Sequence, residues 1–111
     1  MESSWLKTLP VAITVTNKSG KIIEMNDKSA EVFAKYGGYD LIGKDLNNCH
    51  NPHSQEVISS LLSENKTNTY TIEKNGQKKI IFQSPWYEDG QPAGLVEISI
   101  ILPEEMPHFV R

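Results

Sequence analysis

The chain has 111 residues, of which 38% are hydrophobic and 23% charged, and its net charge is −3. This length suits one domain with its own core, and the composition is typical of a soluble globular protein. An acidic balance without a basic stripe argues against nucleic acid as the main partner. The start of the chain lacks the basic and apolar regions of a signal peptide, and no apolar run is long enough to span a membrane. We therefore expect a cytoplasmic protein that does not contact a membrane.

The first quarter of the chain predicts a short helix and a β-hairpin. Residues 2–9 have the spacing of an amphipathic helix, which Pro10 ends. Residues 11–16 and 21–25 are rich in strand-forming side chains, and the turn residues 17–20 separate them.

The middle of the chain predicts helices. Asn26 or Asp27 caps a helix that reaches Tyr36, and Gly37-Gly38 stops it. A helical turn or two follows within residues 39–45, and residues 47–50 are expected to be irregular. Asn51-Pro52 begins the main helix, whose apolar stripe consists of Val57, Ile58, Leu61 and Leu62.

The last part of the chain predicts three strands. Residues 67–74 and 77–84 alternate in the manner of strands around Asn75-Gly76, a strong signal for a two-residue hairpin turn. Pro85-Trp86-Tyr87 extends or bends the second of these strands. A third strand covers residues 94–102, and Pro103 and Pro107 end the regular structure.

This order of elements predicts an α+β fold with one five-stranded antiparallel sheet. The helices that lie between the second and third strands are expected to gather on one face of that sheet. A continuous sheet requires the last strand to lie beside the first, which gives the strand order 2-1-5-4-3. The volume between helices and sheet is where a small protein of this kind would hold a ligand.

Several segments, in this order and spacing, resemble a PAS domain over residues 9–102. They are Leu9-Pro-Val-Ala-Ile-Thr-Val-Thr, Lys21-Ile-Ile-Glu-Met-Asn26, Leu41-Ile-Gly-Lys and Gly94-Leu-Val-Glu-Ile, with Ala30 and Phe33 between them. Cys49-His-Asn-Pro52 is similar to a Cys-His-x-Pro segment that a subgroup has before the main helix. The resemblance implies a bacterial sensory or interaction module that often dimerises and sometimes binds haem, flavin or a small metabolite.

The resemblance divides the chain into three parts. Residues 1–9 form an N-terminal helix for dimer contact and relay, residues 10–103 the PAS-like sensory domain, and residues 104–111 a C-terminal tail. Trp5, Leu6 and Leu9 have little to pack against within so short a helix. They either fold onto the outer face of the sheet or meet a second copy, and we favour a homodimer.

Cys49, His50 and His53 are the one concentrated set of possible metal or cofactor ligands. They provide one ligand too few for a structural zinc site, and no upstream cysteine is present for covalent haem attachment. The favoured interpretation is that Cys49 packs as a small apolar residue and the histidines stabilise the helix start. A non-covalent haem held by His50 or His53 is the alternative, ahead of other metals.

The remaining predicted pocket residues are Phe33, Ile58, Leu61 and Trp86. Core or interface packing is the expected role of Trp86, ahead of ligand stacking. Flavin photochemistry is disfavoured because the residues after Asn48-Cys49 depart from the light-sensing motif. No nucleophile, acid–base pair or phosphate-binding loop indicates an enzyme, although a small enzyme on a similar scaffold is a third hypothesis. The leading hypothesis is a non-enzymatic sensory domain with a small ligand or a signalling partner protein.

Overall fold

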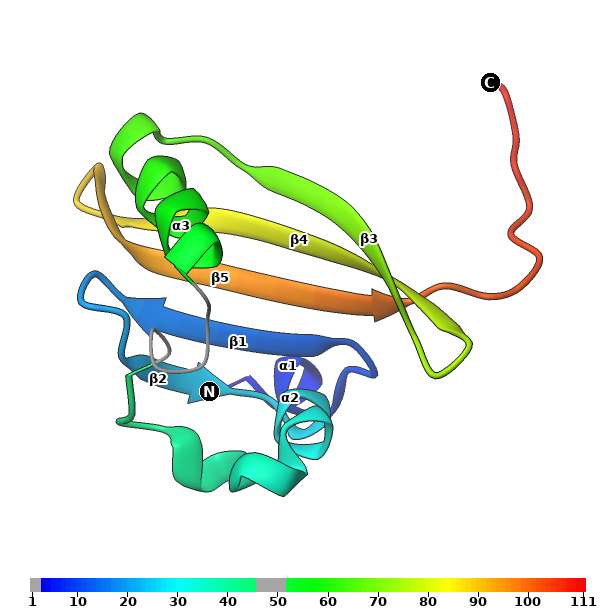
Figure 1. Ribbon diagram of the computed structural model, residues 1–111, viewed down its shortest axis with the longest axis horizontal. Coiled ribbons are helices and arrows are strands. Elements are labelled where there is room, and N and C mark those ends of the chain that lie inside the picture. Colours follow the sequence, from blue (N-terminus) through cyan, green and yellow to red (C-terminus); the bar gives the residue numbers. More distant parts are fainter. Residues whose placement is uncertain (1–2, 46–51) are drawn as a thin grey trace.

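The computed structural model describes residues 3–45 and 52–111 and contains one five-stranded antiparallel sheet. The strands are β1 (Ala12–Asn17), β2 (Ile22–Met25), β3 (Asn68–Lys74), β4 (Gln77–Glu88) and β5 (Gln91–Ile101). Their order in the sheet is β2-β1-β5-β4-β3, with all neighbours antiparallel (Figure 1). The last strand lies beside the first, so the predicted fold class and strand order are confirmed.

The helical segments gather between β2 and β3 in the chain. They are α2 (Asp27–Val32), two 3₁₀ turns (Ala34–Tyr36 and Gly38–Leu41) and α3 (Pro52–Glu64), with α1 (Ser4–Thr8) at the start. Helix α3 crosses β4 and β5, whereas α2 and the 3₁₀ turns lie at the β2 side of the sheet (Figure 1). Among the described residues, no helix combines the length and the apolar character that crossing a membrane requires.

The helix predicted over residues 27–36 is shorter in the structure. Helix α2 ends at Val32, and the chain tightens into a 3₁₀ turn before Gly37 and Gly38 stop it. Phe33 lies at this change and packs against the buried cluster of Ile22, Met25 and Leu41. The 3₁₀ turn therefore coincides with the packing of Phe33 against this cluster. The helical spacing of the sequence does not reveal that contact.

The hairpin between β3 and β4 has the predicted two-residue turn. Asn75 and Gly76 both adopt positive φ angles, 54° and 75°, as a type I′ turn requires. Strand β4 continues through Pro85 to Glu88, with a register shift after Trp86. Pro85 is tolerated because β3 begins opposite Gln83, so no strand lies beside the proline nitrogen.

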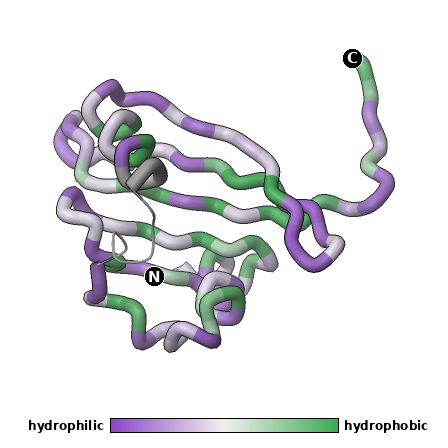
Figure 2. Tube along the Cα trace, in the orientation of Figure 1, coloured by the Kyte–Doolittle hydropathy of each residue, from purple (hydrophilic) through white to green (hydrophobic). Residues whose placement is uncertain are grey.

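The two faces of the sheet differ in burial. On β4, the buried residues Ile81, Gln83 and Pro85 alternate with more exposed ones. Thr14 on β1 shares this face, because it pairs with Glu97 of β5, which pairs with Gln83. Its hydroxyl meets Ser29 of α2. We call this covered side the inner face, and Figure 2 shows the apolar segments concentrated along the middle strands.

Candidate small-molecule site on the inner face of the sheet

Four polar side chains lie in one row across the inner face. Strand pairing places Asn68 opposite Gln83, Gln83 opposite Glu97, and Glu97 opposite Thr14. Partners in antiparallel strands project from the same face, so these side chains are neighbours on β3, β4, β5 and β1. We call them the polar row.

Hydrogen bonds join three members of the polar row. Asn68 Nδ2 donates to Gln83 Oε1 at 3.1 Å, and Gln83 Nε2 donates to Glu97 Oε2 at 3.0 Å. Gln83 is only 4% exposed. A buried amide must have hydrogen-bond partners, and here both ends of the Gln83 amide are engaged. The hydrogen-bonded part of the row therefore ends at the Glu97 carboxylate, whose remaining lone pairs can accept further donors.

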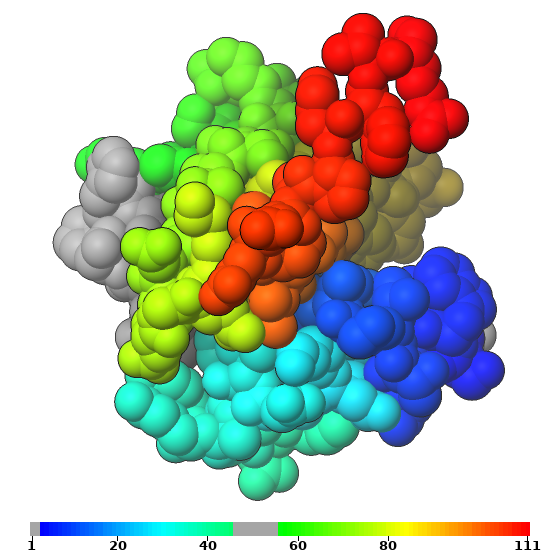
Figure 3. Space-filling view, turned by 90° about the vertical axis from the view of Figure 1, so that its right-hand side faces the viewer, coloured from blue at the N-terminus to red at the C-terminus, as the bar shows by residue number. Residues whose placement is uncertain are grey.

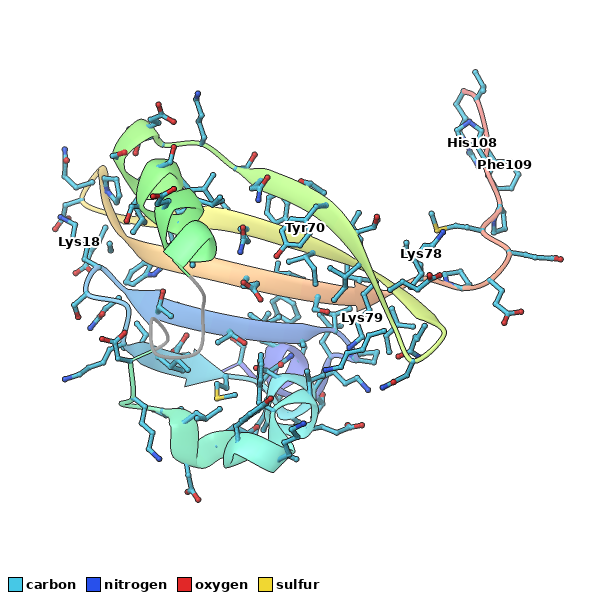
Figure 4. All side chains as sticks on the ribbon, viewed as in Figure 1. Lys18, Tyr70, Lys78, Lys79, His108 and Phe109 are labelled. Atoms are coloured by element: carbon cyan, nitrogen blue, oxygen red, sulfur yellow. The ribbon has the colours of Figure 1, made fainter. Side chains whose placement is uncertain are left out.

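Tyr70 adds a phenol group next to the row. It lies on the same face of β3 as Asn68, two residues further along the strand (Figure 4). Burial raises the pKa of Tyr70 above its ordinary value, and the negative charge of Glu97 raises the pKa further. The phenol thus keeps its proton and can donate it to a hydrogen bond beside the Glu97 carboxylate.

The other end of the row is closed by α2. Thr14 Oγ1 and Ser29 Oγ are 2.6 Å apart, and both residues are buried. Asn26, the residue that caps α2, holds this helix start through Oδ1, which accepts from Ser29 N and from Ile13 N. Buried Ile81 on β4 and buried Leu95 on β5 flank the row on the same face of the sheet. Leu61 is buried on α3, the helix that packs on these two strands. Polar groups among apolar walls are the usual make-up of a small-molecule site.

The structure distributes the predicted pocket residues over three places. Leu61 and half-buried Ile58 belong to α3. Phe33 packs instead with the cluster next to β2. The prediction for Cys49 and His50 falls outside the described residues, and so does the side chain of His53, a residue of the first turn of α3.

Trp86 lies on the opposite face from Gln83, because it is three positions further along β4 and successive side chains alternate between faces. Its indole Nε1 donates to the main-chain oxygen of Thr16 at 2.8 Å and passes over Gly94. A Cβ at position 94 would lie 2.7 Å from that nitrogen, so only glycine leaves room for the contact. The structure therefore gives Trp86 a packing role outside the polar row.

Sequence reasoning missed Asn68, Gln83 and Glu97. Polar residues that alternate with apolar ones along a strand normally indicate the solvent side of a sheet. One signal was present: Glu97 shares its face with Leu95, and Gln83 shares its face with Ile81. Two strands with polar and apolar residues on one face indicate a partly polar interior.

The larger surface grooves among the described residues lie away from the polar row. One, of 440 Å³, runs between the β1–β2 and β4–β5 turns and is lined by residues such as Lys18, Glu88 and Asp89. The other, of 710 Å³, lies between the β3–β4 turn and the start of the C-terminal tail.

No protein-family model matches the chain, and neither does any curated protein sequence. Solved structures do match. A PAS domain from Colwellia psychrerythraea is 23% identical with a TM-score of 0.63, and the match covers 91% of this chain and 93% of that one. The Aer2 receptor from Vibrio cholerae, described as a dual PAS-heme oxygen sensor, is 14% identical with a TM-score of 0.65, over 84% and 95% of the two chains.

A third similar structure is the VqmA dimer from Vibrio cholerae, described among LuxR-type DNA-binding receptors. It is 16% identical with a TM-score of 0.73, and the match covers 91% of this chain but 50% of that one. Identities this low establish the fold, and the chain has the fold of a PAS domain.

Proposed function

We propose that this PAS-fold chain is a sensory domain of signal transduction that binds a small polar molecule under α3. The observation that carries the proposal is the polar row, in which hydrogen bonds join Asn68, Gln83 and Glu97 on the covered face of a small domain. Solved receptors with the same fold support the same role.

The polar row also indicates the chemistry of the ligand. Thr14 and Gln83 are buried, and Asn68 and Glu97 are half-buried. Polar groups taken out of water cost stability unless they are satisfied, so we interpret the row as a feature that serves binding. Glu97 offers carboxylate oxygens, and Tyr70 offers a hydroxyl proton beside them. A small ring compound with one donor and one acceptor, bordered by Leu61 and Leu95, matches these groups.

We propose further that the ligand state is passed on through the N-terminal helix and a homodimer. Trp5 of α1 is 65% exposed, and α1 has no buried residue, so its apolar side chains are open to a partner. A ligand changes the dimer only if it binds two arrangements unequally. This role requires no enzymatic activity and fits a cytoplasmic protein of a bacterium with a signalling partner protein.

The test compares Gln83→Leu with Gln77→Leu. Both glutamines lie on β4 and point to the same face, but Gln77 is exposed at the hairpin end. Native mass spectrometry of freshly purified protein should detect a bound small molecule in the wild type and in Gln77→Leu. The Gln83→Leu variant should lose it, because the connection between Asn68 and Glu97 is broken.

The same proteins are then tested for thermal stabilisation by a panel of small heterocyclic and amide metabolites. A ligand at a hundred times its Kd adds about 2.7 kcal/mol to the free energy of unfolding, which is measurable. Equal binding to wild type and Gln83→Leu would contradict the site, and no binding at all would contradict the ligand-sensing role.

Haem sensing is a second candidate, because one similar structure is a haem oxygen sensor and His53 stands in the first turn of α3. Haem titration should then give a Soret band that His50→Ala or His53→Ala removes. No band after reconstitution would exclude this function.

A further inference from the structure

Asn75 is the one asparagine of the sequence that a glycine follows. It is the first residue of the turn between β3 and β4, and its φ angle of 54° and that of Gly76, 75°, lie in the left-handed region. Residues 74–77 are all exposed. Water therefore reaches both the side-chain amide of Asn75 and the peptide bond that follows it.

The side chain of Asn75 and the nitrogen of Gly76 are both free to react. Among the described residues, neither the Asn75 amide nor the Gly76 N–H has a hydrogen-bond partner. Glycine carries no Cβ, and a Cβ at position 76 would meet no atom of residues 3–45 and 52–111 within 4 Å. The nitrogen of Gly76 is therefore open to approach by the side chain that precedes it.

The turn also lies at an end of the hairpin that few contacts hold. The pair between β4 and β5 nearest the turn is Lys79 with Ile101, followed by one hydrogen bond from Leu102 N to Lys78 O. Residues 74–77 lie past these contacts, and Figure 1 shows the turn beyond the tip of β5. Exposed segments with few buried contacts open locally at a small cost in free energy. The main chain at the turn can thus rotate into a reactive geometry while the domain stays folded.

We propose that Asn75 is a site of spontaneous deamidation. The nitrogen of Gly76 attacks Cγ of Asn75, the Cγ–Nδ2 bond breaks, and the proton of the Gly76 nitrogen leaves with Nδ2 as ammonia. The product is a succinimide ring, and water then adds to one of its two carbonyl carbons. Opening at Cγ gives aspartate, and opening at the main-chain carbonyl of Asn75 gives isoaspartate. The net reaction consumes one water and releases one ammonium ion for each carboxylate formed.

The two products affect the hairpin differently. Both carry a negative charge that asparagine lacks, but isoaspartate also inserts one extra carbon into the main chain of the turn. A two-residue type I′ turn matches the twist of its strands with normal main-chain geometry, and Asp-Gly suits this turn as Asn-Gly does. The pairing of Lys74 with Gln77 is therefore kept in the aspartate form and weakened in the isoaspartate form.

Asn65 is a matched control within the same chain. It is exposed, and its φ angle of 55° is nearly that of Asn75. The residue after it is Lys66, whose side chain crowds its nitrogen and whose N–H donates to Leu61 O at 3.1 Å. Asn65 thus shares the exposure and the φ angle of Asn75 but lacks an open attacking nitrogen.

Peptide mapping by mass spectrometry tests the site in the full chain. The purified protein is incubated at a mildly alkaline pH, which favours deprotonation of the attacking nitrogen, and samples are digested at intervals under acidic conditions. Asn75 should deamidate roughly tenfold faster than Asn65, or more, which corresponds to a barrier about 1.4 kcal/mol lower. Isoaspartate should be among the products, because direct hydrolysis of the amide gives aspartate alone. Equal rates at the two asparagines, or aspartate without isoaspartate, would overturn the proposal.

A second measurement compares the wild type with Asn75→Gly and Asn75→Asp. Gly-Gly suits the same turn but carries no amide, so the wild type should gain an acidic fraction in anion exchange much faster than Asn75→Gly. That fraction should unfold at a lower urea concentration than freshly purified Asn75→Asp, because it contains isoaspartate. Equal gain of acidic protein in the wild type and Asn75→Gly would contradict the site, and equal urea midpoints would contradict the effect on the hairpin.

Discussion

At the scale of single residues, Asn26 connects three segments of the chain. Its Oδ1 accepts from Ile13 N at 2.9 Å and from Ser29 N at 3.0 Å. Its Nδ2 donates to the main-chain oxygens of Leu6, Leu9 and Val11. The residue is fully buried. One amide thus fixes α1, the start of β1 and the start of α2 relative to one another.

Replacing Asn26 by alanine should lower the free energy of unfolding by about 3 kcal/mol, because buried donors and acceptors are left without partners. Urea unfolding measures this change. The control is Asn17→Ala, which removes an amide from the exposed β1–β2 turn and should cost about 1 kcal/mol. Equal losses in the two variants would show that Asn26 has no connecting role.

Sequence reasoning at this scale succeeded where one residue type serves one local conformation. Asn26 was among the expected caps, and Asn75-Gly76 predicted its turn. It failed for Gln83 and Glu97, because their environment depends on which strands lie beside them and on what covers that face. Pairing across three strands is a tertiary property, and the alternation along one strand does not contain it.

At the scale of elements, α1 is held to the rest of the chain by charged and polar side chains. Lys7 Nζ lies 3.0 Å from Asp27 Oδ1, and the hydroxyl of Tyr39 donates to the same oxygen. The hydrogen bond from Tyr39 and then the one from Lys7 lower the pKa of Asp27, while the bond to Asp27 raises the pKa of Tyr39. These contacts join α1, α2 and the second 3₁₀ turn at the surface.

The pH dependence follows from these directions. Because the folded state lowers the pKa of Asp27 below 3.8, its stabilisation is present above that pH and disappears as the pH falls through the lowered value. Because the folded state raises the pKa of Tyr39 above 10.0, its stabilisation is lost as the pH rises through the raised value. The contact between Asp27 and Tyr39 therefore stabilises the folded state fully at pH values between 3.8 and 10.0.

Asp27→Asn should shift the urea midpoint downward at pH 7, and the shift should shrink toward zero as the pH falls below 3.8. Unfolding curves at pH 7 and pH 3 measure the difference. Asp89→Asn, in the exposed β4–β5 turn, is the control and should show no such convergence. A pH-independent shift for Asp27→Asn would contradict the role of the charge.

The order of the strands was predictable because the chain offers few ways to join two hairpins into one sheet. The bounds were less predictable. The helix over residues 27–36 divides at Phe33 because of its packing with Ile22, Met25 and Leu41, and β5 begins at Gln91 rather than Gly94. The first difference arises from contacts with distant segments, and the second from the pairing of Gln91 with Glu88 across the β4–β5 turn. Local propensity records neither.

At the scale of the whole molecule, the body of the domain ends with β5. The C-terminal tail leaves the sheet beyond Ile101 and stands clear of α1 and α2 (Figures 1 and 3). Met106, Phe109 and Val110 are exposed, and Figure 4 shows His108 and Phe109 away from the strands. The last main-chain hydrogen bond to the sheet is from Leu102 N to Lys78 O.

Deleting residues 104–111 should therefore change the free energy of unfolding by less than about 0.5 kcal/mol, because every one of these residues is exposed. A longer deletion from residue 100 removes the pairing of Ile100 with Ile80 and should destabilise the domain clearly. Urea unfolding of both forms gives the comparison. A loss of more than about 1 kcal/mol in the shorter deletion would show that the tail packs on the domain.

The bond from Trp86 to Thr16 has a consequence for spectroscopy. The chain has two tryptophans, and they occupy contrasting surroundings. Trp86 is half-buried and hydrogen-bonded where β4 reaches across β5 to β1, whereas Trp5 is exposed on α1. Their fluorescence therefore reports separately on the interior of the sheet and on the N-terminal helix, so one emission spectrum follows both regions without an added label.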